Sequence, residues 1–331
     1  MTEIDRRFCI APMMDWTDRH CRYLLRLIFA KGLLYTEMVT ASAVRHGNRE
    51  KLLSFNAFER PLALQLGGSD PDDMAFAAEQ GQRFGYDEVN INVGCPSDRV
   101  QAGMFGACLM AAPATVAAAV TAMKSAVHIP VTVKTRIGVD QQDDYEFLHR
   151  FVATVAAAGC EVFIIHARKA LLQGLSPKEN REIPPLQYER VYRLKEDFPE
   201  LKIVLNGGIN STGDVALHLN KVDGVMVGRR AYQDPYALAD VGRLIFSEQH
   251  FPSREEVVRD YMLYIEEQLS RGVALKHMTR HMSGLYQGLS GARAWRRILS
   301  EDACKPKAGL EVIQMALEQM TSRRQQVDYG T

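Results

Sequence analysis

The chain has 331 residues, of which 47% are hydrophobic and 24% charged, and this globular composition excludes disordered, collagen-like and coiled-coil proteins. Forty basic and forty acidic residues give a formal net charge of +0, so any site for a polyanion must be local. No stretch approaches the roughly 18 apolar residues of a membrane span, and six scattered cysteines without a CxxC pair favour neither disulfides nor zinc. We therefore expect a soluble cytoplasmic protein with no metal and no membrane contact.

Short apolar runs recur through the first three quarters of the chain, and each is followed by a turn and a helical stretch. The predicted strands are Phe8–Met14, Leu33–Val39, Pro61–Gly68, Glu88–Cys95, Ile129–Gly138, Glu161–Arg168, Lys202–Ile209 and Asp223–Arg230. Asp70-Pro71 and Ala112-Pro113 mark the starts of two intervening helices. Eight such units predict an α/β fold of the TIM (β/α)8 barrel type. An open doubly wound sheet is less favoured, because no GxGxxG motif follows the first run.

The sequence changes character after Phe246, where a linker around Pro252 precedes segments without a strand pattern. The predicted helices are Arg254–Leu269, Val273–Met282, Ala292–Leu299 and Lys307–Met320. We therefore predict a barrel domain over residues 1–247 and a small all-α helical bundle domain over residues 248–331.

Polar side chains stand where the predicted strands end, which is the working surface of a barrel of this kind. The residues selected are Met13, Gln65, Asn92, Cys95, Lys134, Arg136, His166, Arg168, Asn206, Gly207, Gly208, Gly228 and Arg229. Folding alone does not readily explain polar residues at so many strand ends.

The loops after the seventh and eighth predicted strands form the usual phosphate site of such barrels. Asn206-Gly207-Gly208 offers unobstructed backbone N–H groups, and Gly228-Arg229 adds a close-approach glycine and a guanidinium. Two glycines can also make a tight turn and nothing more. The pairing of the two loops favours a phosphorylated ligand.

Lys134, Gln65 and Cys95 suggest redox chemistry on a ring, although each has a simpler interpretation. A lysine stabilises negative charge on a reduced ring, and an amide satisfies a ring edge. A free thiol has a pKa of about 8.5, so it is mostly protonated at neutral pH and can donate a proton. Alone, Lys134 could be a surface charge, His166 a core imidazole and Cys95 a packing residue. Cys108 has apolar neighbours on both sides and is expected in the core.

These residues lie in motifs that resemble those of the tRNA-dihydrouridine synthases, and within them the A subfamily. The motifs are Ala11-Pro-Met-Met-Asp-Trp-Thr-Asp, Asn90-Ile-Asn-Val-Gly-Cys-Pro-Ser, Val133-Lys-Thr-Arg-Ile-Gly, His166-Ala-Arg, Gly174-Leu-Ser-Pro-Lys-Glu-Asn-Arg, Asn206-Gly-Gly-Ile and Gly228-Arg. The second and fifth are specific, whereas the last two occur in many flavin barrels.

The resemblance implies an FMN-dependent enzyme that uses NADPH to reduce uridines at positions 20 and 20a in the D loop of tRNA. Flavin N5 would deliver hydride to uracil C6, and Cys95 would protonate C5. FMN would be held by Pro12, Met13, Met14, Gln65, Lys134, His166, Asn206, Gly207, Gly208, Gly228 and Arg229. Asn92 and Arg136 would face the uracil. A monomer is the family expectation.

A stretch from Gln268 to Ser300 contains no acidic residue and could neutralise tRNA phosphates. Its cations are Arg271, Lys276, Arg280, Arg293, Arg296 and Arg297. Trp295 and Tyr286 are candidate stacking faces, and Lys178 and Arg181 would extend the basic surface toward the barrel mouth. We interpret His277 and His281 as residues of this basic face and not as metal ligands. The alternative is a solvated helix face without a partner.

Two other functions remain open from the sequence. One is a small-molecule pyrimidine reductase of the dihydroorotate type, against which the acid-free basic stretch argues. The other is a tRNA-binding protein whose barrel no longer catalyses, against which the full set of polar strand ends argues.

Overall fold

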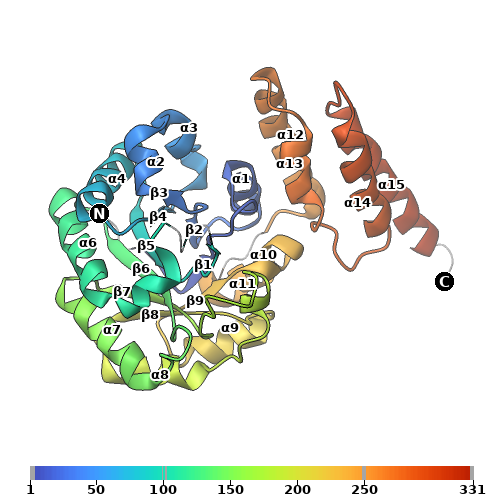
Figure 1. The fold of residues 1–331 in the computed structure, drawn as a ribbon. Helices are drawn as coiled ribbons and strands as arrows, with labels where there is room; N and C mark the ends of the chain where they lie inside the picture. Colours follow the sequence, from blue (N-terminus) through green and yellow to red (C-terminus); the bar gives the residue numbers. More distant parts are fainter. Residues whose placement is uncertain (1–3, 99, 101–102, 248–250, 329–331) are drawn as a thin grey trace. The chain divides into compact units, whose positions relative to one another are not determined.

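The computed structural model describes residues 4–98, 100, 103–247 and 251–328, with side chains described up to residue 320. Its strands form one parallel sheet in the order β2-β1-β9-β8-β7-β6-β5-β4-β3, and a β2–β4 pairing closes this sheet into a barrel (Figure 1). The strands are β1 (Phe8–Ile10), β2 (Leu33–Tyr35), β3 (Val39–Thr40), β4 (Leu62–Gly67), β5 (Glu88–Val93), β6 (Val131–Arg136), β7 (Val162–His166), β8 (Lys202–Asn206) and β9 (Gly224–Val227). The predicted barrel is confirmed.

One predicted strand, Leu33–Val39, is divided in the structure. Its two parts, β2 and β3, both pair with β4, at Leu34↔Leu62 and at Val39↔Leu66. Together they occupy a single position in the barrel, which therefore keeps eight positions for nine strands.

The described helices follow the strands as the alternating pattern predicts (Figure 1). Those up to β9 are α1 (Arg19–Ile28), α2 (Ala41–His46), α3 (Arg49–Leu53), α4 (Pro71–Phe84), α6 (Pro113–Ala126), α7 (Tyr145–Ala157), α8 (Tyr188–Asp197) and α9 (Thr212–Leu219), with short 3-10 turns η1 (Ala57–Glu59), η2 (Gly106–Ala111) and η3 (Glu179–Arg181). Asp70 caps α4 by accepting the N–H of Asp73, whereas Ala112 gives α6 no side-chain cap. Both helices begin at the predicted proline.

The chain packs as two compact units. The first contains the described residues of Met1–Asp15 and Gly32–Gly228, and the second those of Trp16–Lys31 and Arg229–Thr331. The second unit therefore gains α1 from the N-terminal part of the chain. These packing units are not the predicted domains 1–247 and 248–331, whose separate roles remain predictions.

The second unit is helical in its described residues. After β9 it contains α10 (Arg229–Gln233), α11 (Ala237–Phe246), α12 (Arg254–Ser270), α13 (Lys276–Thr279), η4 (Arg280–Met282), α14 (Ala292–Glu301), η5 (Asp302–Cys304) and α15 (Glu311–Asp328). The helix predicted over Val273–Met282 is thus a short α-helix followed by a 3-10 turn. None of the helices in the described part of the chain is long and apolar enough to cross a bilayer.

Inside the barrel, polar and apolar side chains occupy different sectors. Alternate strand residues share a face, so the lumen receives one residue in two from each strand. Most of the apolar lumen residues come from β1, β2, β7, β8 and β9, and one comes from β4. They form a buried cluster of Cys9, Ala11, Leu33, Tyr35, Ala63, Val162, Ile164, Val204 and Met226. Strands β5 and β6 instead carry the same-face polar rows Glu88-Asn90-Asn92 and Thr132-Lys134-Arg136. The polar sector leads to the mouth of the barrel.

Candidate active site

The strand register brings the predicted site residues together at one end of the barrel. Asn92 on β5 is paired with Lys134 on β6, and two residues further along, Arg136 is paired with His166 on β7. His166 is in turn paired with Asn206 on β8. Because parallel strands end at the same rim, these side chains form one continuous arc over four neighbouring strands.

This arc is rich in positive charge. Lys134 Nζ donates a hydrogen bond to Asn206 Oδ1 at 3.0 Å, and Asn206 Nδ2 donates to the carbonyl of Met226 at 2.7 Å. Burial and the charge of Arg136 lower the pKa of Lys134 to about 7, and burial lowers the pKa of Arg136 to about 10. Burial and the same two cations hold the pKa of His166 well below its usual value, so its imidazole is neutral. Such a site favours an anionic ligand, which would restore the protonated lysine.

The backbone requires glycine at two of the three positions of the predicted phosphate site, and the third differs from them. Gly207 and Gly208 have φ of 115° and 72°, and added Cβ atoms would lie 2.6 Å from the ring of His166 and 2.5 Å from Tyr188 Oη. The turn itself therefore demands both glycines. Gly228 has no left-handed backbone, and a Cβ there would make ordinary contacts of 3.6 Å with Met13 and 3.7 Å with Ala11. Packing alone does not require glycine at 228, whereas close approach of a ligand would.

Cys95 stands on the loop that leaves β5. Asn92 Oδ1 accepts the backbone N–H groups of Gly94 at 3.1 Å and Cys95 at 3.0 Å, and the Cys95 carbonyl accepts the N–H of Ala107 at 2.9 Å. The thiol is half-buried and lies 3.4 Å from Ser97 Oγ. A fixed backbone and a partly accessible thiol suit a proton donor at the barrel mouth, and that role remains a prediction.

Arg136 connects this loop to a second one. Its Nε donates to the carbonyl of Gly94 at 2.8 Å, and its Nη1 donates to the carbonyls of Lys169 at 2.9 Å and Asn180 at 3.0 Å. The side chain is 4% exposed. That Arg136 faces the substrate stays a prediction, whereas its bonds to the Gly94, Lys169 and Asn180 carbonyls hold two loops together.

Arg136→Lys is expected to loosen the loop that follows β7. One ammonium group cannot reproduce the guanidinium bonds to three carbonyls, so we expect a loss of about 1–3 kcal/mol in unfolding free energy. Lys178 and Arg181 are exposed trypsin sites in this loop, and their cleavage should accelerate. Thermal unfolding and limited proteolysis measure both effects. Arg60→Lys is the control, because that arginine is 53% exposed and bonds to Asp87. Unchanged cleavage in Arg136→Lys would contradict the assignment.

The remaining predicted site residues occupy varied environments. Gln65 is 1% exposed, Pro12 and Met13 are half-buried, and Met14 is 56% exposed. Lys178 and Arg181 lie exposed in the loop after β7. In the second unit, Arg229 begins α10, and α14 exposes Arg293, Arg296 and Arg297. No group of three or more His, Cys, Asp or Glu in the described residues could hold a metal ion.

Three predictions for the second unit and one for the barrel are wrong. Trp295 and Tyr286 are 0% exposed and pack edge to face at 4.8 Å, so neither offers a stacking surface. His281 is 2% exposed and bonds through Nε2 to Asp18 at 3.1 Å, so it does not belong to the basic face. Cys108, which the sequence placed in the core, is half-buried. Amphipathic patterns locate a helix but do not tell which neighbouring element covers its aromatic side.

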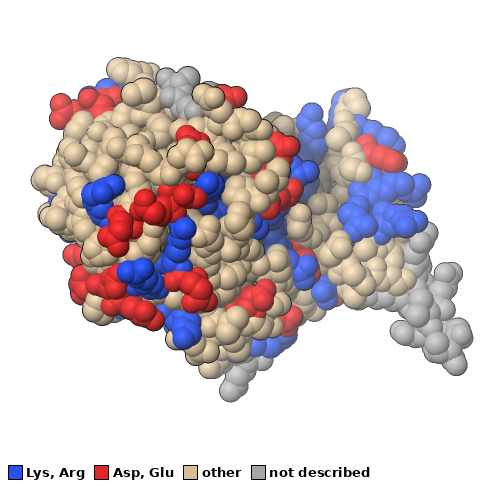
Figure 2. Space-filling view, turned by 60° about the horizontal axis from the view of Figure 1, so that its bottom comes forward, with Lys and Arg blue, Asp and Glu red and all other residues tan. Residues whose placement is uncertain are grey.

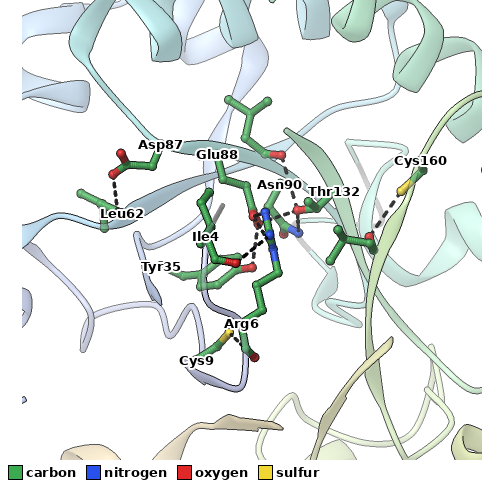
Figure 3. Close-up of polar contacts among 12 residues, drawn as sticks. Ile4, Arg6, Cys9, Tyr35, Leu62, Asp87, Glu88, Asn90, Thr132 and Cys160 are labelled. Atoms are coloured by element: carbon green, nitrogen blue, oxygen red, sulfur yellow. Dashed lines mark hydrogen bonds and ion pairs between the residues drawn. The ribbon is translucent and has the colours of Figure 1, made fainter. Parts of the chain in front are cut away.

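A buried polar network at the floor of the barrel was not predicted from the sequence. Arg6, Tyr35 and Thr132 converge on the carboxylate of Glu88, and Asn90 bonds to Thr132 (Figure 3). The signal was present in the alternation of Glu88, Asn90 and Asn92, which places polar groups on one face of an otherwise apolar strand.

Comparison with known proteins shows the family of this chain. The family model for dihydrouridine synthase (Dus) matches residues 9–322. The chain is 61% identical over 316 residues to a tRNA-dihydrouridine(20/20a) synthase of Shewanella oneidensis, which covers 95% of this chain and 94% of the relative. The protein of the same name from Vibrio cholerae is 60% identical over 313 residues, which are 94% of this chain and 95% of the relative. The one from Escherichia coli K12 is 58% identical over 320 residues, which are 96% of this chain and 92% of the relative.

Among solved structures, a complex of 2-naphthoyl-CoA reductase matches with a TM-score of 0.55 at 12% identity, over 73% of this chain and 50% of that one. At this identity the likeness concerns the barrel fold alone. The family match and the relatives show the class of this protein: it is a flavin-dependent oxidoreductase. The chain belongs to the dihydrouridine synthase family.

Proposed function

We propose that this protein reduces uridines at positions 20 and 20a of tRNA to 5,6-dihydrouridine, with FMN held at the barrel mouth and NADPH as the reductant. The relatives named above are called tRNA-dihydrouridine(20/20a) synthases, which supports the product and the two positions. The observation on which the proposal most depends is the placement of the Cys95 thiol at the end of β5, beside the strand that carries Lys134.

The residues at the mouth fit an anionic flavin nucleotide. Lys134 would hold positive charge beside the ring, and Asn206 keeps its ammonium group in place. Gly207, Gly208 and Gly228 together with Arg229 would hold the phosphate through backbone N–H groups and a guanidinium. When bound, reduced FMN would supply hydride to C6 of the uracil ring.

The chain's own residues would complete the reduction. The Cys95 thiol would donate its proton to C5, while Asn92 holds the backbone of its loop. Arg136 would keep that loop in register with the one carrying Lys178 and Arg181. Since the target base belongs to a folded RNA, it must leave its stack to enter the site.

The direct test is to map dihydrouridine in tRNA from cells with and without the gene. Loss of the modification at positions 20 and 20a supports the proposal, and its persistence there contradicts it. Turnover of free uracil or orotate at rates that match tRNA would instead support the small-molecule reductase.

We further propose that the exposed arginines of α14 bind tRNA phosphates. Figure 2 shows basic side chains gathered on part of the helical unit, whereas the barrel surface in this view mixes both signs. Arg293, Arg296 and Arg297 are all exposed, and Arg296 bonds only to the neutral amide of Gln287 among the described residues. By contrast, Arg271 and Arg280 have acidic partners, Glu267 and Asp18.

Arg293→Ala combined with Arg296→Ala is expected to weaken tRNA binding and to flatten its salt dependence. Each lost phosphate contact should reduce the slope of log K against log salt by about 0.7–0.9. Binding titrations at several salt concentrations measure this, and flavin reduction by NADPH should stay unchanged. The charge-matched control is Arg83→Ala with Arg150→Ala, on the barrel helices α4 and α7. An unaltered slope in the α14 variant would remove this assignment.

A further inference from the structure

A continuous series of hydrogen bonds crosses the polar sector of the barrel, from its floor to the Cys95 loop. Thr132 Oγ1 donates to Glu88 Oε1 at 2.7 Å, and Asn90 Nδ2 donates to Thr132 Oγ1 at 2.9 Å. Gln65 Nε2 donates to Asn90 Oδ1 at 2.8 Å, and Asn92 Nδ2 donates to Gln65 Oε1 at 2.8 Å. The backbone N–H of Cys95 completes the series by donating to Asn92 Oδ1.

Both ends of this series consist of groups that cannot exchange donor and acceptor roles. At the floor, Glu88 is paired with Arg6, whose Nη2 lies 2.6 Å from Oε2, and a carboxylate offers only acceptors. At the mouth, the backbone N–H groups of Gly94 and Cys95 only donate. The amides between could each be turned over, since a carboxamide has an acceptor at one end and a donor at the other.

The two ends impose the same direction on every amide between them. Thr132 must donate to the carboxylate, so its lone pair accepts the NH2 of Asn90, and Asn90 Oδ1 then faces the NH2 of Gln65. Gln65 Oε1 must face Asn92, which turns Asn92 Oδ1 toward the loop. Reversing one amide would place two donors or two acceptors against each other in a site from which water is excluded.

The groups of this series are buried, so breaking any one of its hydrogen bonds is costly. Glu88, Asn90 and Thr132 are 0% exposed, and Gln65 is 1% exposed. No solvent competes for these groups, so a broken bond leaves an unsatisfied polar atom that drives its neighbour to another position. Tyr35 also donates to Glu88 Oε1, at 2.7 Å, but it lies outside the series (Figure 3).

We propose that Thr132 and Glu88 are positioning residues for the reaction, because through Asn90 they fix the orientation of the Gln65 and Asn92 amides and thereby the Cys95 loop. This inference rests on the proposed function for the roles of Gln65 and Cys95. Neither Thr132 nor Glu88 lies at the mouth, so both act on the reaction only through other residues.

The test compares Thr132→Val, which breaks the series at nearly constant volume, with Thr132→Ser, which keeps the hydroxyl. Thr132→Val is expected to lower kcat for dihydrouridine formation about tenfold, because small displacements at a reacting centre have large effects on rate. In the free protein, the loosened loop should raise the alkylation rate of Cys95 by iodoacetamide at least about threefold. Thr132→Ser should keep both values within about twofold of the native protein. Peptide-resolved mass spectrometry follows Cys95, with exposed Cys304 as the internal reference.

Tyr35→Phe is the matched control for a merely structural effect. It removes the other hydrogen bond to Glu88 Oε1 but leaves the series intact, so the melting temperature should fall as in Thr132→Val while kcat and alkylation stay near native. Native kcat and alkylation in Thr132→Val would overturn the proposal, as would equal kcat losses in Tyr35→Phe and Thr132→Val. A native protein that forms no dihydrouridine would contradict the proposed function, and the alkylation comparison would still decide on the series.

Discussion

Cys95→Ala is expected to keep flavin bound and to lower dihydrouridine formation by a factor of about 10²–10⁴, the usual contribution of a positioned general acid. The backbone contacts of residue 95 do not involve the thiol: Asn92 accepts its N–H, and its carbonyl accepts from Ala107. Alanine therefore preserves these backbone bonds and removes the thiol together with its one described contact, to Ser97 Oγ. Single-turnover assays with prereduced flavin and tRNA measure the step directly.

Cys108→Ala is the matched control for this experiment. Cys108 lies on η2, is half-buried like Cys95, and its thiol donates to the carbonyl of Phe105. Its loss should leave the rate within about twofold of native, since the thiol bonds only to the Phe105 carbonyl of its own turn among the described contacts, and the backbone bond from Ala107 to Cys95 is kept. Undiminished turnover in Cys95→Ala would reject Cys95 as the acid and leave the flavin assignment untouched.

Lys134→Met is expected to weaken FMN binding by about 10- to 100-fold, because a hydrogen bond to a charged group contributes about 1.5–3 kcal/mol. Methionine keeps a similar length and removes the ammonium group that Asn206 holds. Flavin titration followed by fluorescence measures the loss. Lys124→Met, which removes a lysine from the barrel helix α6, should bind FMN as the native protein does.

The same variant tests the lowered pKa of Lys134 in flavin-free protein. The folded state holds this pKa at about 7, against 10.5 for an ordinary lysine, so the unfolded chain binds more protons between these values. The free energy of unfolding therefore rises with pH from about 7 toward 10.5. The buried ammonium group destabilises the folded state most below pH 7. Relative to native, Lys134→Met should be most stabilised near pH 6 and lose that advantage by pH 10. A stability difference independent of pH would contradict this.

The sequence predicted the elements of the barrel because its strands are buried on both faces and are read as apolar runs. It also located the polar strand ends, since their positions follow from strand length alone. The split of Leu33–Val39 into β2 and β3 escaped prediction, because the break depends on how two short segments pair with β4.

The hydrogen-bond partners of the site residues could not be predicted, because they lie in segments distant in the sequence. Arg136 bonds to carbonyls 33 and 44 residues away, in a loop whose course no local pattern indicates. Trp295 donates its indole N–H to the carbonyl of Met282 inside the helical unit, so a residue predicted as a stacking face from its place in the basic stretch belongs to the core. Burial and pairing of this kind arise only when the chain has folded.

The sequence by itself determined the fold class, the family and which residues stand at the mouth of the barrel, because hydrophobic periodicity and short motifs are local properties of the chain. Only the tertiary structure decided which polar groups are satisfied by one another. The directed hydrogen bonds from Glu88 to Cys95 join strands β4, β5 and β6, and the direction of each amide is fixed by neighbours that are remote in sequence.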